Sequence, residues 1–484
     1  MLLRAVDEVR RVIQENGGTN ILEVNAGASA CLLAFTPTAT APEEIGRSVI
    51  QALAAHPLYR LGTFVASLQE VGENFACDRA ALLAKNRWEQ MQTSSLVYPD
   101  LQNGKYHGQW VCEADHLRPA AAHYRHWDVE KREWRDEVLS QSTYARHEYG
   151  KEERKNFYHT EAGLAVPCLV NDLNEMAADG PQGPLNRKIA VIHVDGNGFG
   201  KLFLDRCSKP EQQGEASRAL RECQCEFLRQ LFRAIEEHGD GWYYSRETED
   251  GEQEAALRLE TLQWGGDELT FVVPAWKGWY FLDLFFRLAS GWRPFGADVP
   301  VTHCGGLVFC NRKCDIHTAA HLAKELCETA KEVCAARGKP AGMTGNLLAY
   351  QVLESFDHIG KRVDVKYFNK RCRFLPHDDA GPMVLPASKL GALWKAEHAL
   401  RDEIPRRKVH EIVRALVAGH ANKAGEIIQD TWKGLGSCPE AQAQFLEFAK
   451  LLGGADEKWP AAWFHFHELW DYIGFEDWQW EAAP

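Results

Sequence analysis

The stretch LQWGGDELTFVVPA, residues 262–275, decides how this chain folds. Two apolar runs flank the four residues Gly265, Gly266, Asp267 and Glu268. Glycine and aspartate here predict a tight hairpin turn, because glycine readily adopts the positive φ that such turns require. The apolar arms predict strands that are buried in a sheet. Two adjacent acids at the tip of a buried hairpin need a reason beyond the turn itself.

The segments around this hairpin alternate between strands and helices. The pattern predicts a strand, a helix, two strands, a helix and a strand, over 188–194, 215–238, 256–264, 269–275, 279–292 and 301–310. This βαββαβ order is the split-βαβ, ferredoxin-like arrangement, an antiparallel sheet with helices on one face, and the fold class is α+β. A further helix over 316–338 and a strand over 347–356 follow.

The order of these elements predicts that three carboxylates meet. In a βαββαβ sheet the first strand lies beside the central hairpin, and Asp195 directly follows the first strand. Asp195, Asp267 and Glu268 are therefore expected at one edge of the sheet. Carboxylates this close raise one another's pKa values, and a hard divalent cation relieves their repulsion. Oxygen ligands suit Mg²⁺ or Mn²⁺, so the sequence predicts such a site at these three residues.

The glycines near the acids suggest a place for a nucleotide. Gly265 and Gly266 leave room for a base or a ribose. Gly196, Asn197 and Gly198 form a turn at the start of a predicted helix, and its backbone N–H groups could face phosphates.

Two motifs together resemble a known family. HVDGNGFGKLF (193–203) followed by WGGDELTFVVPA (264–275) is similar to the palm domain of GGDEF nucleotide cyclases and of the large polymerase-like subunit of type III CRISPR effector complexes. The CRISPR subunit is the closer relative, because HLAKELCETAK (321–331) resembles its last palm helix. The segment ILEVNAGASACLLAF (21–35) sits where this family has a first palm that has lost its acids.

This sequence departs from the patterns of these two groups of relatives in three places. Glu268 replaces the usual second aspartate of the turn, as in diguanylate cyclases. Asn197 replaces the second acid of the first motif, which weakens metal ligation there. Leu269 stands where diguanylate cyclases carry phenylalanine.

The resemblance implies a nucleotidyltransferase with two divalent ions, Mg²⁺ or Mn²⁺, at Asp195, Asp267 and Glu268. It would convert nucleoside triphosphates, with ATP favoured, to a cyclic or linear oligonucleotide signal in antiviral defence. The implied nucleotide contacts are Gly196, Asn197, Gly198, Phe199, Gly265, Gly266, Lys324 and Lys331, with Lys201 as a weaker candidate.

Two other functions stay open. A non-catalytic subunit would bind nucleotide while its helical tail docks CRISPR-type effector subunits, and RNA is a further partner to consider. A diguanylate cyclase would use GTP. The sequence does not decide between a monomer and a homodimer.

The length of 484 residues predicts several domains. The expected division is a degenerate palm-like domain (1–85), an irregular insert (86–185), the catalytic palm (186–375) and a helical C-terminal domain (376–484). The first block is expected to run strand, turn, strand, helix and strand, with the last strand over 62–71.

Charge and composition limit the kinds of binding partner and the cellular location that we expect. A net charge of −13 argues against binding nucleic acid through a broad basic surface. We find no apolar run near the length of a membrane span, and the N-terminus has the pattern of an amphipathic helix and not of a signal peptide. The expected location is therefore the cytoplasm, where the 14 cysteines would be reduced thiols.

Two cysteine groups leave a zinc site open. Cys304, Cys310, Cys314 and His317 have loose spacing, and two of them lie on a predicted core strand, which favours buried free thiols. Cys112 with His116 and His123 forms the second group, for which packing is the favoured interpretation.

Overall fold

The computed structural model describes residues 2–473, except 28–29, 61, 94–110, 115, 117, 129–132, 167, 179, 181–184, 238–240, 248–251, 337–344, 354–383, 453 and 455. The chain divides into two compact units. The first unit contains Met1–Val166 and Phe203–Arg218, and the second contains Pro167–Leu202 and Ala219–Pro484. Within the described part of the chain, no helix is long and apolar enough to cross a bilayer.

The first unit contains two small antiparallel sheets and four helices of its own among its described residues. The elements are α1 (Leu2–Glu15), β1 (Gly18–Ala26), β2 (Cys31–Pro37), α2 (Pro42–Ala55), α3 (Phe75–Gln92), β3 (Ala122–Asp128), β4 (Glu133–Leu139) and α4 (Gln141–Ala162). Strand β1 pairs with β2, and β3 pairs with β4. Helix α2 begins at a proline followed by two acids, which fit the positive end of a helix.

One predicted strand of this unit is wrong. The residues 62–71 form no strand in the structure, because their backbone joins neither small sheet. Phe64 instead packs edge-on against Tyr59, next to the apolar core under α1 and α2. Hydrogen bonds from side chains of α3 also hold the segment: Lys85 donates to the carbonyl of Leu68 and Asn86 to the hydroxyl of Ser67, each at 3.0 Å.

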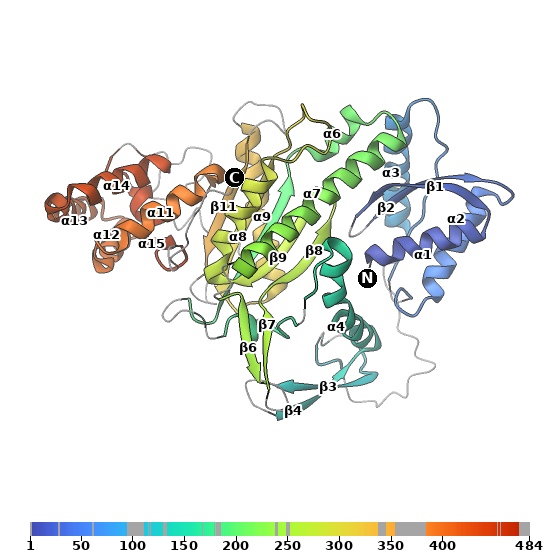
Figure 1. The fold of residues 1–484 in the computed structure, drawn as a ribbon, viewed down its shortest axis with the longest axis horizontal. Coiled ribbons are helices and arrows are strands. Elements are labelled where there is room, and N and C mark those ends of the chain that lie inside the picture. Colours follow the sequence, from blue (N-terminus) through green and yellow to red (C-terminus); the bar gives the residue numbers. More distant parts are fainter. Residues whose placement is uncertain are drawn as a thin grey trace. The chain divides into compact units, whose positions relative to one another are not determined.

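The second unit contains the main sheet and the C-terminal helices (Figure 1). Its first half comprises α5 (Leu173–Met176), β5 (Lys188–Gly196), α6 (Phe199–Arg206), α7 (Pro210–Glu237), β6 (Tyr243–Glu247), β7 (Gln253–Leu257), β8 (Glu260–Gly265), β9 (Glu268–Pro274) and α8 (Ala275–Ala289). Parts of α6 and α7 group with the first unit. The second half comprises β10 (His303–Asn311), α9 (Ile316–Ala336), β11 (Leu347–Val352), β12 (Val384–Pro386), η2 (Ala387–Lys389), α11 (Leu390–Arg401), α12 (Arg406–Val417), α13 (Ala421–Gly434), η3 (Leu435–Ser437), α14 (Pro439–Leu451) and α15 (Pro460–Leu469).

The main sheet has six strands in the order β12-β11-β10-β5-β9-β8. Strand β5 is antiparallel to both β9 and β10, and β8 is antiparallel to β9. Strand β11 runs parallel to β10, so the complete sheet is mixed. The expected α+β class is confirmed, and the four strands predicted to be antiparallel pair in that way. Of the predicted strand 347–356, the residues 354–356 lie outside the described part.

The predicted strand 256–264 is two strands, and its prediction as one is wrong. Strand β7 pairs with β6 in a separate ribbon, and β8 belongs to the main sheet. Between them, the backbone N–H of the buried Arg258 donates to the carbonyl of Trp242, 2.8 Å away. This bond extends the β6–β7 ribbon by one residue pair, and the chain joins the main sheet at Glu260.

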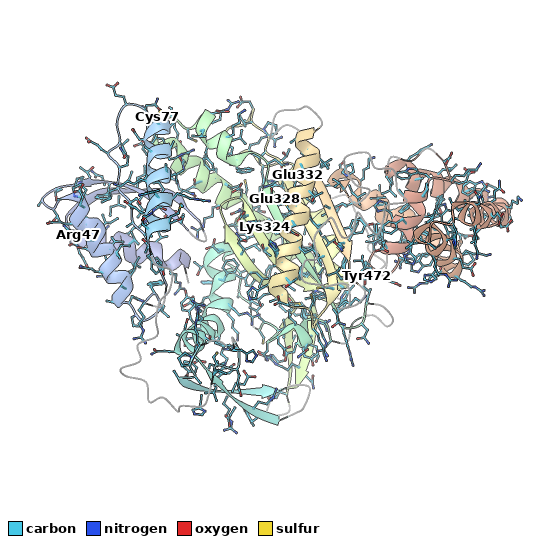
Figure 2. The ribbon with its side chains drawn as sticks, turned by 180° about the vertical axis from the view of Figure 1, so that it is seen from behind. Arg47, Cys77, Lys324, Glu328, Glu332 and Tyr472 are labelled. Carbon is cyan, nitrogen blue, oxygen red and sulfur yellow. The ribbon has the colours of Figure 1, made fainter. Side chains whose placement is uncertain are left out.

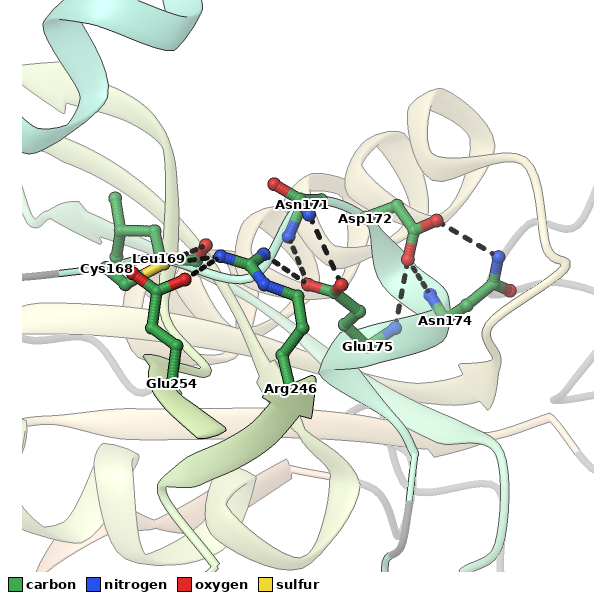
Figure 3. Close-up of polar contacts among 8 residues, drawn as sticks. All are labelled: Cys168, Leu169, Asn171, Asp172, Asn174, Glu175, Arg246 and Glu254. Atoms are coloured by element: carbon green, nitrogen blue, oxygen red, sulfur yellow. Dashed lines mark hydrogen bonds and ion pairs between the residues drawn. The ribbon is translucent and has the colours of Figure 1, made fainter. Parts of the chain in front are cut away.

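An ion pair between Glu175, whose side chain is buried, and Arg246 connects the segment before β5 to the β6–β7 ribbon (Figure 3). The carboxylate of Glu175 accepts hydrogen bonds from the backbone of Asn171 at 2.6 Å and from Arg246 at 3.3 Å. Arg246 also pairs with Glu254 and donates to the sulfur of Cys168 at 2.8 Å. The guanidinium and the buried carboxylate therefore satisfy each other.

Helices cover both faces of the sheet. Gly278 of α8 lies so close to β5 that an added Cβ would approach the Cβ of Ala190 to 2.5 Å, and Phe227 of α7 packs on Phe271 of β9. Gly306 of β10 faces α9, where an added Cβ would lie 1.8 Å from the carbonyl oxygen of Ala323. Figure 2 shows α9 in front of the sheet when the molecule is seen from behind.

Side chains alternate between these two faces along each strand. Ala190 faces α8, so the odd-numbered side chains of β5, including His193 and Asp195, face α9. The register of β5 with β9 places Thr270 beside His193, and therefore Glu268 on the same face. The fold thus directs one end of β5 and one end of β9 under the same helix.

The C-terminal helices pack through aromatic side chains. Trp463 of α15 is buried against Phe445 of α14, with ring centroids 4.3 Å apart. His465 of the same helix lies 2.6 Å from the hydroxyl of Tyr350 on β11, which ties the helical part to the sheet.

Candidate functional site

The Gly-Gly-Asp-Glu segment forms the tip of the β8–β9 hairpin. Gly265 pairs with Glu268, and Gly266 and Asp267 form a two-residue turn. The φ angles of the two glycines are 154° and 62°, and a II′ turn requires glycine at the position of Gly266. A Cβ added to Gly266 would meet nothing within 4 Å, so the backbone angle and not crowding requires glycine there.

The three predicted acids meet at the end of β5. Ligand atoms of Asp195, Glu268 and His193 all lie within 4.8 Å of one another. Asp267 lies outside this set. It is still a neighbour of Asp195, since, after burial, the charge of Asp195 and a hydrogen bond with it raise the pKa of Asp267. The structure thus brings together the carboxylates that the sequence analysis expected to meet, and it adds a histidine.

The crowding of the carboxylates appears in their pKa values. Burial and then the charge of Asp195 raise the pKa of Asp267 from 3.8 to about 7. Burial also raises the pKa of Asp195, although Lys331 opposes the shift. For Glu268, burial would raise the pKa, but hydrogen bonds from Lys324 and Gln263 outweigh it and leave the pKa below its ordinary value.

Two lysines of α9 neutralise the acids in the structure. Lys324 lies 2.9 Å from Glu268, and Lys331 pairs with Asp195 and lies 3.3 Å from Glu328. The lysines are two helical turns apart, so both lie on the face of α9 that is turned to the sheet. Lys324 and Glu328 can be followed along α9 in Figure 2. These are the lysines predicted to contact phosphates.

His193 is the residue of this group that the sequence analysis missed. Its Nδ1 lies 2.9 Å from the hydroxyl of Thr270, and its buried Nε2 has no hydrogen-bond partner among the described residues. Burial lowers the pKa of His193 to about 4, so the ring is neutral near pH 7. The available signal was its position two residues before Asp195 in a strand, which places both side chains on one face.

Some polar groups of the turn after β5 form hydrogen bonds within the protein. The backbone N–H of Asn197 donates to the carbonyl of Thr302 at 2.8 Å, and its side-chain amide donates to the Thr302 hydroxyl at 3.1 Å. Gly198 has a φ of 69°. Phe199 is buried, with ring contacts to Phe295 and His303.

Because the N–H of Asn197 is bound to Thr302, the predicted contact with phosphates depends on the other backbone N–H groups of the turn. The ring of Phe199 packs against Phe295 and His303. Lys201 is exposed on α6. The nucleotide contacts expected at the turn and at Lys201 stay predictions.

The cysteine groups do not form metal sites among the described residues. There, His193, Asp195 and Glu268 are the one group of three or more metal-ligating side chains close enough to share an ion. Cys304 and Cys310 are buried free thiols on β10, as expected, and Cys112 is buried in a small apolar cluster with Tyr124 and Leu139. A zinc site at either cysteine group is therefore not supported.

The fold and the site together define an α+β protein with an acidic, lysine-paired site at one end of a mixed sheet. No family model and no curated protein matches the sequence. Solved structures that resemble the fold include those of Csm1, the type III CRISPR subunit whose family the motifs resemble.

The similarity to these structures is long but weak. Csm1 from T. onnurineus is 14% identical with a TM-score of 0.47, and the match covers 97% of this chain and 64% of Csm1. The apo Csm1–Csm4 cassette gives 15% identity, a TM-score of 0.43 and coverage of 98% and 66%. The cassette with cA4 gives 13% identity and a TM-score of 0.39, and the match covers 98% of this chain and 66% of that chain. The chain thus spans about two thirds of these chains, and a likeness at this level does not establish an activity.

Proposed function

We propose that this protein is a metal-dependent nucleotidyltransferase that converts nucleoside triphosphates, ATP first among them, to a linear or cyclic oligonucleotide. The observation that carries the proposal is the meeting of Asp195, Asp267 and Glu268 beneath Lys324 and Lys331. The strand order β10-β5-β9-β8, with α7 and α8 on one face, supports a ferredoxin-like palm as the scaffold.

The residues at this site fit divalent cations. Three carboxylates are crowded, the pKa of Asp267 is raised to about 7, and the buried Nε2 of His193 has no partner within the described part of the chain. Asp195, Asp267 and Glu268 would hold Mg²⁺ or Mn²⁺. When bound, the ions would lower the pKa of an attacking ribose hydroxyl and neutralise the triphosphate and the leaving pyrophosphate.

The lysines of α9 have two roles in this proposal. In the structure they neutralise Glu268 and Asp195. Once the carboxylates bind cations, Lys324 and Lys331 are available to hold phosphate oxygens. The open space beside Gly266 leaves the tip of the hairpin accessible to a sugar or a base.

The reaction would be an in-line nucleotidyl transfer. A ribose hydroxyl oxygen bonds to the α-phosphorus of a second nucleotide, the bond from that phosphorus to pyrophosphate breaks, and the hydroxyl proton leaves to solvent. The protein contributes mainly through positioning and electrostatic stabilisation.

The choice of adenine nucleotide and of biological setting belongs to the proposal. Related structures are described as Csm1–Csm4 cassettes in complex with pppApApA, cA4, AMPPNP and cA3. Those ligands are properties of those complexes. For this chain we propose a role in antiviral defence, with effector subunits, RNA or a second copy of the chain as partners to test.

The test uses the full chain with each of the four ribonucleoside triphosphates and Mn²⁺. We expect pyrophosphate release and a product visible by mass spectrometry, and loss of both in Asp195→Asn and Asp267→Asn. Lys423→Met, an exposed lysine on α13, is the matched control and should keep full turnover. Pyrophosphate release that persists in the Asp267→Asn protein would contradict the proposal.

A non-catalytic nucleotide-binding subunit is the second candidate. The replacement of the second acid of the first motif by Asn197, whose side chain is bound to Thr302, favours it. Nucleotide binding by calorimetry without pyrophosphate release under any metal and nucleotide condition would decide for this candidate. A product from GTP alone would indicate a diguanylate cyclase.

A further inference from the structure

We infer that the Nε2 atom of His193 is a ligand of the cation held by Asp195 and Glu268, and that this site therefore prefers Mn²⁺ or Co²⁺ to Mg²⁺. The inference rests on the proposed metal-binding role of the two carboxylates. It adds a nitrogen donor to a site that the sequence predicted from oxygen ligands alone.

The surroundings of His193 give its side chain a fixed orientation. His193 is 1% exposed and lies on β5 directly before Val194 and Asp195. Its partner in register on β9 is Thr270, whose hydroxyl lies 2.9 Å from Nδ1. Because Asp195 and Glu268 lie one position further along the same face, the ring lies below both carboxylates.

A chain of hydrogen bonds determines which nitrogen of the ring carries the proton. The amide nitrogen of Gln263 donates to Glu268 at 2.6 Å, so the amide oxygen of Gln263 is turned toward Thr270. The Thr270 hydroxyl donates to that oxygen at 3.3 Å. Its own oxygen is then free to accept from Nδ1–H of His193, which leaves the lone pair on Nε2.

One ring nitrogen of His193 and one carboxylate oxygen each of Asp195 and Glu268 lie within 4.8 Å of one another. Because Nδ1 is engaged by Thr270, Nε2 is the nitrogen left to act as a ligand. Lys331 and Lys324 pair with the two carboxylates, whereas the buried Nε2 has no partner among the described residues, and leaving a buried polar atom unpaired is costly. A cation between Nε2 and the two carboxylates would satisfy all three, and transition metals accept carboxylate oxygens together with an imidazole nitrogen.

The nitrogen donor has a consequence for the identity of the ion. Mg²⁺ strongly prefers oxygen ligands, whereas Mn²⁺ and Co²⁺ accept imidazole more readily. The side chain of Thr270 then acts as a positioning residue, because it orients the ring and fixes its tautomer.

The experiment is Mn²⁺ binding followed by electron paramagnetic resonance on the full chain without nucleotide. Electron spin-echo modulation should detect one histidine nitrogen bound to Mn²⁺ in the wild-type protein and none in His193→Leu. The Mn²⁺ affinity should fall at least about tenfold in His193→Leu, and also in Thr270→Val, where the carboxylates are intact. The Mg²⁺ affinity, measured by competition, should change much less.

The control is His321→Gln, which alters an exposed histidine of helix α9 and should change neither the nitrogen signal nor the affinity. Mn²⁺ that binds in a carboxylate-dependent way without a nitrogen signal would overturn the role of His193 and leave the proposed carboxylate site standing. An absence of Mn²⁺ binding would overturn both. If His193→Leu does not fold, the wild-type nitrogen signal and the Thr270→Val affinity still decide.

Discussion

Asp267 is the residue whose protonation state depends most on the crowding at the site. Burial and the charge of Asp195 raise its pKa from 3.8 to about 7, so the metal-free folded protein keeps a proton that the unfolded chain has lost. The free energy of unfolding without metal should therefore decrease as the pH rises from about 4 to about 7. A metal bound to the carboxylates would remove this effect.

The substitution Asp267→Asn tests this pH dependence. Without metal at pH 8, the variant should be more stable than the wild type, by at most about 4 kcal/mol for such a shift. Lys331 lies close to the pair, so we expect about 1–2 kcal/mol. At pH 4, close to the ordinary pKa of 3.8, the two proteins should differ little. Urea denaturation in EDTA at both pH values measures this, and parallel pH profiles would show that Asp267 is not crowded.

Lys331 links the acids to the proposed substrate. Its ammonium group pairs with Asp195 in the structure and is proposed to hold phosphate once cations are bound. Lys331→Met should weaken binding of a non-hydrolysable ATP analogue with Mn²⁺ about tenfold or more, because a charge-assisted hydrogen bond contributes about 1.5–3 kcal/mol. Calorimetry measures the affinity. An unchanged affinity, equal to that of the Lys423→Met control, would exclude Lys331 from the phosphate site.

At the scale of elements, the position of α9 over the sheet depends on Gly306. An added Cβ would lie 1.8 Å from the carbonyl oxygen of Ala323, so Gly306→Ala must push helix and strand apart. We expect a loss of stability of about 1–3 kcal/mol, as for other overpacked cores, and a lower Mn²⁺ affinity. Gly425→Ala is the control, since a Cβ on this exposed glycine of α13 meets nothing within 4 Å. Equal stabilities of the two variants would mean that α9 does not pack this closely.

The sequence predicted the strands correctly where an apolar run corresponds to a single strand. The apolar run 188–194 and the arms of the hairpin at Gly265 and Gly266 became neighbouring strands, which is why Asp195 could be placed beside Glu268. The prediction of one strand over 256–264 failed because periodicity does not reveal that Arg258 leaves one sheet for another.

His193 was missed for a similar reason. A histidine in an apolar strand is most often packed in the core. Its significance depends on the β5–β9 register, which places Thr270 beside Nδ1, and this register depends on contacts between distant parts of the chain.

At the scale of the whole molecule, length and composition predicted the domain organisation less well than the local patterns predicted the strands. Length and composition indicated several domains, and the structure groups the described residues into two compact units. The expected boundary near residue 375 lies outside the described residues, and the four-domain division stays a prediction. Local sequence does not determine such boundaries, because they depend on which elements share a core.

The most direct test of the central claim is diffraction from crystals grown with Mn²⁺ and a non-hydrolysable ATP analogue, with data collected at the manganese absorption edge. We predict anomalous peaks bounded by Asp195, Asp267 and Glu268, with the triphosphate between these peaks and the lysines of α9. A nucleotide bound elsewhere, with no manganese peak between the end of β5 and the β8–β9 turn, would contradict the claim.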